Sequence, residues 1–330
     1  MVGLGVSRPD GGAPLPQASG LPAASLAQSR RARRAALHAM KASTFYSAKL
    51  WQLGLWSVRK LPPRLCEQMC RGLARGYCQL HRRRRETVIH NLLPGLNGDW
   101  AAASQAAREL FENFALKLVD LWRFESGQSI DGWIREWTGW EFFEAARSRR
   151  QGILVLTPHL GNWELGGPVL TQRGLKLHVI TQAEPETGLT QMRQAARARW
   201  GIETLVVGTN PFAYLEIIQR LKAGATVALL VDRPSPAGAV TVNLFGRPFP
   251  ASLAAAELAR ASGAALIPVC LPRAEHGYGV FALPEIRYDP DQLEAREARI
   301  ALTQEIIRAF EPVIRQYLNQ WYHFVPIWPA

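Results

Sequence analysis

Residues 159–164 read His-Leu-Gly-Asn-Trp-Glu and join an imidazole to a carboxylate five positions later. An imidazole held by a carboxylate is a general base able to deprotonate a hydroxyl. On one regular helix, residues five apart lie about 140° apart, so His159 and Glu164 meet only if the chain bends between them. Gly161 permits that bend. The alternative is a structural histidine, with Glu164 only complementing a helix dipole.

A second candidate group follows the apolar run 225–231, where the chain continues Asp232-Arg233-Pro234-Ser235. Ligands of open α/β sheets bind at the carboxyl ends of the strands, and both His159 and Asp232 directly follow a predicted strand. The two groups are therefore expected at the same edge of a sheet. A purely structural Asp232–Arg233 ion pair is the other interpretation.

The elements that must position these residues alternate between strand and helix from Gly152 onward, which indicates an α/β sheet with helices on both faces. His159 falls on a strand-to-helix turn, and Asn162 is a candidate N-cap of the following helix. Strands are predicted at 152–157, 175–181, 203–207, 225–231, 239–245, 265–271 and 279–287, and helices at 162–172, 187–199, 211–222, 252–262 and 291–319.

The N-terminal third is predicted to be helical, with helices at 44–59, 64–80 and 101–124. The first is short, aromatic and flanked by lysine and arginine, a composition typical of a helix lying in a membrane interface. Packing on the main domain is the alternative. Arg82–Arg85 form either a solvated face or a grip on lipid phosphates. No stretch reaches the roughly 18 apolar residues of a membrane-spanning helix, and the Gly-, Pro- and Ala-rich residues 1–40 are expected to be disordered.

The chain of 330 residues carries a net charge of +12, which favours anionic partners. A membrane surface, an acidic protein and nucleic acid all satisfy that criterion. No helix-turn-helix, zinc-finger or RNA-recognition signature is present, so nucleic acid is not expected as a partner.

Five motifs in order resemble one known family. Residues 159–164 resemble the His-x4-Asp/Glu motif of glycerolipid and lipid A acyltransferases. Within that motif, Gly161-Asn162-Trp163 resembles the sequence found in one branch of the family. That branch contains the late, lauroyl- and myristoyl-type lipid A acyltransferases and the phosphatidylinositol mannoside acyltransferases. The similarity covers about residues 60–325, and the four further motifs are Asp232-Arg233, Phe245-Gly246-Arg247-Pro248, Ala259 to Pro268, and Asn319-Gln320-Trp321-Tyr322.

The resemblance implies a glycerol-3-phosphate-acyltransferase-like αβα sandwich with a mixed, mostly parallel sheet. It implies a disordered extension at 1–40, a helical membrane-associating region at 41–125 and an acyltransferase core at 126–330. The expected location is the cytoplasmic face of the bacterial inner membrane, as a peripheral or monotopic protein at an anionic surface.

The activity implied is transfer of an acyl group from an acyl carrier protein or coenzyme A thioester to a lipid hydroxyl, with no cofactor and no metal. His159 is the expected base, and Glu164 or Asp232 orients its ring. Backbone N–H groups near Gly161–Trp163, or Arg233, are expected to stabilise the oxyanion. Arg197 is a candidate for an acceptor phosphate; Gly161, Asn162, Trp163, Phe245, Gly246, Arg247 and Pro248 are further candidates for substrate binding.

The acceptor stays open at this point. A lipid A precursor or a related glycolipid is the leading expectation, and a phosphatidylinositol mannoside-like or ornithine lipid-like acceptor is the alternative. The loop Gln182-Ala183-Glu184-Pro185-Glu186 departs from the Arg and Asn that relatives often carry there.

Overall fold

A computed structural model describes residues 47–182, 187–207, 212–233 and 238–329. By its internal contacts the chain divides into two units, residues 1–43 and 44–330, and every described residue belongs to the second. The expected disorder of residues 1–40 and the departure at 183–186 lie outside the described residues.

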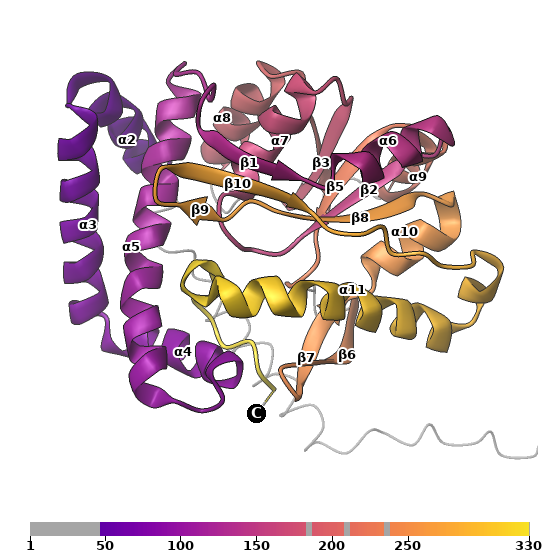
Figure 1. The fold of residues 1–330 in the computed structure, drawn as a ribbon. Helices are drawn as coiled ribbons and strands as arrows, with labels where there is room; N and C mark the ends of the chain where they lie inside the picture. The colour runs from indigo at the N-terminus through magenta and orange to yellow at the C-terminus, as the bar shows by residue number, and fades with distance from the viewer. Residues whose placement is uncertain (1–46, 183–186, 208–211, 234–237, 330) are drawn as a thin grey trace, which may run out of the picture. The chain divides into compact units, whose positions relative to one another are not determined.

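A mixed sheet forms the centre of this unit (Figure 1). Its strand order is β1-β10-β8-β2-β5-β3-β4, with β9 paired to β10. The pairs from β8 to β4 are all parallel, whereas β10 runs antiparallel to β8. The prediction of a mixed, mostly parallel α/β sheet is confirmed. The strands are β1 Ile134–Thr138, β2 Ile153–Thr157, β3 Leu177–Gln182, β4 Glu203–Val207, β5 Thr226–Leu230, β8 Ala265–Cys270, β9 Arg273–Ala274 and β10 Gly277–Ala282.

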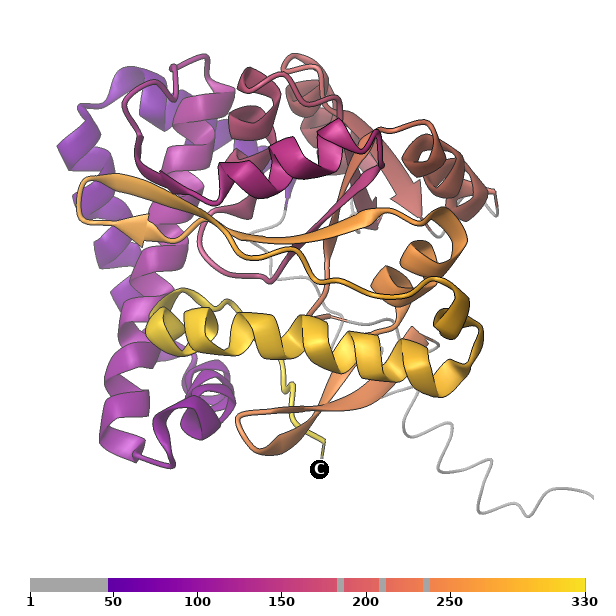
Figure 2. The ribbon, with the colours of Figure 1, turned by 45° about the vertical axis from the view of Figure 1, so that its right-hand side comes forward.

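Helices cover both faces of the sheet, because the central strands are apolar on both sides. Along β2, Ile153 and Val155 enter one core cluster, while Leu154 and Leu156 enter the other. In Figures 1 and 2, α6 lies above the sheet and α11 runs along the opposite side. The helices of this part are α6 Trp140–Ser148, α7 Trp163–Gln172, α8 Thr187–Ala198, α9 Ala213–Lys222, α10 Ala254–Ser262 and α11 Arg296–Gln316.

The N-terminal helices pack beside the sheet around the long helix α5, which contacts α2, α3 and α4. Gly54 lets α2 approach closely, since a Cβ there would meet the Trp122 ring at 2.4 Å. Among the described helices, none combines the length and the apolar character needed to cross a bilayer. The bounds are α2 Ala48–Lys60, α3 Pro63–Leu80, α4 Arg82–Leu92 and α5 Trp100–Glu125.

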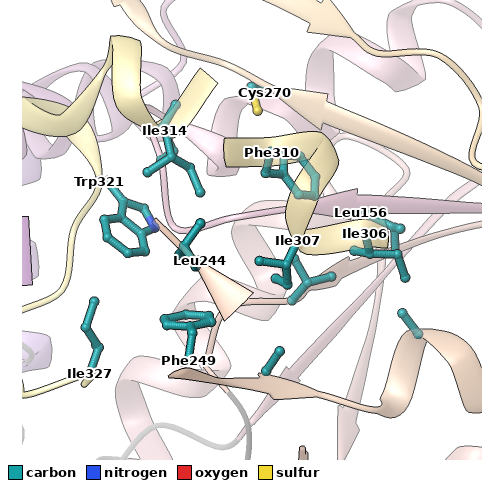
Figure 3. Packing of buried hydrophobic residues seen from close by; sticks show 14 of the residues in the cluster. Leu156, Leu244, Phe249, Cys270, Ile306, Ile307, Phe310, Ile314, Trp321 and Ile327 are labelled. Atoms are coloured by element: carbon teal, nitrogen blue, oxygen red, sulfur yellow. The ribbon is translucent and has the colours of Figure 1, made fainter. Parts of the chain in front are cut away.

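A separate two-stranded hairpin, β6 Ala239–Leu244 and β7 Arg247–Ser252, packs under α11. Figure 3 shows Leu244 and Phe249 of this hairpin near Trp321 and Ile314. Through Trp321, this second layer supports the segment after α11, which enters the candidate site.

Candidate active site

His159 lies just past the end of β2 and is almost buried. The neighbouring strand β5 runs parallel to β2, with Thr157 opposite Leu230, so the residues that follow the two strands meet. His159 Nδ1 is 2.6 Å from Asp232 Oδ1. The sequence left two acids as partners of His159; the structure selects Asp232.

Asp232 is clamped by further donors on its other oxygen. Oδ2 accepts hydrogen bonds from the His159 backbone N–H, from Trp321 Nε1 and from His323 Nε2, each 2.9 Å long. The side chain is only 1% exposed. Burial alone raises the pKa of Asp232, but the neighbouring His159 and His323 overcome that effect and hold the pKa well below its usual range. Asp232 is therefore a fixed carboxylate.

This arrangement determines which nitrogen of His159 is basic. An ionised Asp232 accepts a hydrogen bond from the Nδ1–H group of His159, which leaves the lone pair on Nε2. No described residue forms a hydrogen bond with Nε2. Burial lowers the pKa of His159 and the Arg233 charge lowers it further, while Asp232 opposes both. The ring is consequently neutral near pH 7, the form that accepts a proton.

Glu164 occupies a different position from the one the motif suggested. It lies in the first turn of α7, where Arg193 forms an ion pair with one oxygen and Arg197 lies 3.1 Å from the other. Burial raises the pKa of Glu164, but the two arginines reverse that shift and lower it strongly. The role of Glu164 as partner of His159 is therefore wrong, and Arg197, expected on a substrate phosphate, holds Glu164 instead.

The turn between β2 and α7 depends on Gly161, whose φ is +62°. A Cβ at this position would lie 2.0 Å from the Leu271 carbonyl oxygen. The Gly161 N–H donates to Gln320 O at 3.0 Å, and the Asn162 N–H donates to Leu271 O at 2.9 Å. These two amides were candidates for the oxyanion hole, but neighbouring strands and the C-terminal segment already bind them.

Asn162 sits at the N-cap position of α7 without capping it. Its amide nitrogen donates instead to Tyr278 Oη at 3.1 Å and to the Lys117 carbonyl at 3.4 Å. The predicted N-cap position is therefore confirmed, but the side chain does not cap the helix, because it is bonded to Tyr278 and to the backbone of α5. Trp163 is half-buried, and its ring meets the His159 ring edge-on at 5.1 Å.

Arg233 holds the C-terminal segment. Its Nε donates to His323 Nδ1 at 3.4 Å and its guanidinium donates to the Tyr322 carbonyl. The guanidinium that was expected at the oxyanion is thus engaged in fixing His323, which in turn fixes Asp232.

Residues 245–248 form the turn between β6 and β7 and the first part of β7. They do not line the candidate site beside His159. Phe245 and Gly246 both have positive φ, which is typical of a two-residue hairpin turn. Phe245 packs against Trp321 and beneath Arg315, while Arg247 and Pro248 are exposed. Among the described residues, Phe245 contacts Trp321, which bonds Asp232, but no residue of 245–248 contacts His159 or Asp232 directly.

Sequence reasoning missed His323 and Lys117. His323 directly follows the Trp321-Tyr322 motif, and a histidine among buried aromatic residues was the available signal. Lys117 lies on α5; the residue is only 3% exposed, and its Nζ lies 3.2 Å from the centre of the Trp163 ring.

In the described parts of the chain, no group of three or more His, Cys, Asp or Glu side chains is placed to hold a metal ion.

Residues 37–329 match the model of the bacterial lipid A biosynthesis acyltransferase family. The chain belongs to this family. It is also similar to phosphatidylinositol mannoside acyltransferases of Mycobacterium tuberculosis, with 28% identity over 194 residues, and of Mycolicibacterium smegmatis, with 28% identity over 193 residues. These matches cover 58% of this chain and 59% and 60% of the relatives, so the chain spans about three fifths of the curated relatives it matches.

Among solved structures, a 1-acyl-sn-glycerophosphate (LPA) acyltransferase from Thermotoga maritima is similar at 13% identity, covering 75% of this chain and 97% of that one. The TM-score is 0.36, too low to carry a conclusion. Membership of the lipid A acyltransferase family therefore rests on the family match alone.

Proposed function

We propose that this protein is a membrane-surface O-acyltransferase that moves a fatty acyl chain from a thioester to a lipid hydroxyl. The observation that carries the proposal is the His159–Asp232 pair, which leaves a neutral imidazole with an available Nε2 in a chain of the lipid A acyltransferase family. A hydroxyl attacks a thioester only when a base removes its proton, and His159 supplies that base.

The reaction requires no covalent enzyme intermediate. The lipid hydroxyl oxygen bonds to the thioester carbonyl carbon while its proton passes to His159 Nε2. Asp232 stabilises the resulting imidazolium through Nδ1. The carbonyl then re-forms, the carbon–sulfur bond breaks, and His159 returns the proton to the departing thiolate. Acyl carrier protein and coenzyme A both supply such a thioester.

The acceptor we propose is a hydroxyl of a lipid A precursor or a related glycolipid. A phosphatidylinositol mannoside-like acceptor is the second candidate, and the names of the mycobacterial relatives favour it specifically. Both acceptors are glycolipids with exposed sugar hydroxyls, so the same base chemistry serves either.

A location at an anionic membrane surface, on the cytoplasmic side of the bacterial inner membrane, fits the outer faces of α2 and α3. We call these faces the α2/α3 apolar surface; its exposed members are Leu50, Leu53, Trp56, Leu65, Met69, Leu73 and Leu80. α2 contains no acidic residue, and the one acid of α3, Glu67, is paired with Arg123. An exposed apolar surface bordered by cations is what an anionic bilayer binds.

The direct test is His159→Ala in purified protein, assayed with acyl carrier protein and coenzyme A thioesters against both acceptors, with mass spectrometry of the product. Wild type is expected to form an O-acylated lipid, and His159→Ala to lose transfer while unfolding at a similar temperature. His276→Ala is the matched control, because that side chain is 79% exposed and remote from Asp232 in its described contacts. A folded, fully active His159→Ala protein refutes the proposal.

A further inference from the structure

Lys117 is the exception among the buried charges around the site. Asp120 and Arg123 pair with each other and with further partners, Glu164 pairs with two arginines, and Asp232 pairs with two histidines. The Lys117 ammonium has no hydrogen bond or ion pair with any described residue. Its neighbours are the rings of Trp163 and Phe114, at 3.2 and 5.7 Å from Nζ to the ring centres.

Such a cation is costly in the free protein, because burial removes its water and the rings repay only part of the loss. Burial lowers the pKa of Lys117 to about 7; Glu164 opposes that shift, while Arg193, Arg233 and Arg197 reinforce it. A buried positive charge without a directly bonded partner is stabilised by an anion that forms beside it.

The position of Lys117 relates it to the reaction. The Trp163 ring is shared: Lys117 lies over its face, and His159 meets it edge-on at a centroid distance of 5.1 Å. The Lys117 backbone carbonyl also accepts a hydrogen bond from Asn162 of the histidine motif. The ammonium is therefore fixed against the same turn that carries the base.

Of the other candidates for stabilising an oxyanion, three already bind acceptors, and the fourth is the Trp163 N–H at the start of α7. The Gly161 and Asn162 amides donate to Gln320 and Leu271, and the Arg233 guanidinium holds Tyr322 and His323. Lys117 differs from Arg233 in this respect: its described contacts are with two aromatic rings, and none is a hydrogen bond to an oxygen.

We propose that Lys117 is a catalytic residue whose ammonium stabilises the oxyanion formed when the lipid hydroxyl attacks the thioester. This inference rests on the proposed acyl transfer. As the carbon–oxygen bond forms, the carbonyl electron pair moves onto oxygen, and the Lys117 charge faces it in a site with little water. Because the ammonium has no hydrogen bond or ion pair with a described residue, its N–H groups are available to the oxyanion as the negative charge develops in the transition state.

The test is Lys117→Met, which keeps the length and apolar stem and removes the charge. We expect kcat to fall about 10²- to 10³-fold, the loss typical of one oxyanion donor, with KM for thioester and acceptor within about threefold. The unfolding temperature at pH 7 should be equal to or above that of wild type, since a buried charge is lost. Lys176→Met, at an exposed lysine, is the matched control and should leave kcat unchanged.

Two outcomes overturn the inference. One is a Lys117→Met protein with wild-type kcat and wild-type KM; the other is wild-type kcat with a raised KM for the acceptor, which would place Lys117 on a ground-state anion such as a phosphate. If the variant does not fold, wild type decides: its kcat should fall as pH rises through about 7, where Lys117 loses its proton near Glu164, Arg193, Arg197 and Arg233. A kcat that stays level to pH 9 contradicts the role.

Failure of the inference and failure of the proposed function give different results. If wild type transfers no acyl group from any thioester, the proposed function is wrong and the inference falls with it. If wild type is active and His159→Ala is inactive while Lys117→Met is fully active, only the role of Lys117 is wrong.

Discussion

At the scale of single residues, Asp232 explains most of the site. Four hydrogen bonds converge on its carboxylate, two from His159 and one each from Trp321 and His323. Hydrogen bonds to a charged group are stronger than neutral ones and fix geometry. The His159 ring is therefore oriented by Asp232, and Asp232 is oriented by residues from a distant segment of the chain.

We expect Asp232→Asn to lower kcat about 10⁴-fold, the loss seen when an amide replaces the carboxylate that fixes a catalytic histidine tautomer. Glu164→Gln is the comparison, because Glu164 contacts arginines and not His159. It should lower the unfolding free energy by about 3 kcal/mol through two unpaired arginines, while kcat per folded molecule falls less than tenfold. Equal losses of kcat in the two variants, measured well below both unfolding temperatures, would contradict this assignment.

The pH dependence of the wild-type rate follows from the lowered pKa of His159. Activity needs the neutral ring, and burial together with Arg233 makes that form persist to lower pH than for an ordinary histidine. The rate constant kcat/KM should therefore not decline as pH falls from 7 through 6.5, and it should decline only at lower pH. An acid limb at or above pH 6.5 in a pH–rate profile would show that burial does not control this group.

At the scale of elements, the turn from β2 into α7 leaves no room for a side chain at Gly161. Gly161 adopts a left-handed conformation and approaches the Leu271 carbonyl, whereas Gly166, in α7 itself, has no atom within 4 Å of an added Cβ. One glycine is required by geometry, and the other only weakens a helix.

Gly161→Ala should lower the unfolding free energy by at least about 2 kcal/mol, because alanine disfavours a positive φ and its Cβ would clash with the Leu271 carbonyl. Gly166→Ala, the matched control five residues later, should raise stability by up to about 1 kcal/mol. Chemical denaturation of the two variants measures both effects, and a stable Gly161→Ala protein would mean that the turn adapts.

The same scale shows what the sequence predicted and why. The strands β2, β4 and β5 and the helices α3 and α5 were predicted to within about two residues, because their apolar periodicity is strong. β1 was missed, since Ile134–Thr138 is a mostly exposed edge strand, and α4 was missed because it begins with four arginines. β7 was hidden by Pro248 and Pro250.

The sequence predicted where His159 and Asp232 lie, but not all of the contacts of the candidate site. His159 and Asp232 follow buried strands, so their edge of the sheet was predictable. That Glu164 turns toward Arg193 and Arg197 depends on where α8 packs, which no local pattern contains. A single lysine within a predicted helix gives no signal of its own, and only the folded arrangement shows the contact of Lys117 with Trp163.

At the scale of the whole molecule, the membrane binding that we propose has two sources, the net charge of +12 and the α2/α3 apolar surface. Long-range attraction to an anionic bilayer decreases with salt, whereas burial of leucine side chains does not. Binding that depends on both should require anionic lipid and should weaken, without vanishing, at high salt.

Leu73→Glu tests that surface, because Leu73 is 71% exposed on α3. It should weaken binding to anionic vesicles about tenfold or more, since one buried leucine contributes about 1.5–3 kcal/mol. Leu215→Glu is the matched control on α9, where the leucine is 56% exposed. Vesicle flotation with both variants gives the answer, and equal weakening by the two would assign binding to charge alone.

The donors that hold Asp232 have a consequence for how the protein is made. Trp321 and His323 lie 89 and 91 positions after the acid they bind. During translation the segment that carries Asp232, just after β5, is made long before those donors. Until they are made, burying the carboxylate would leave it with fewer hydrogen bonds. The hydrogen bonds that hold Asp232 are therefore completed only late in synthesis, and a chain that ends before residue 321 lacks two of the four.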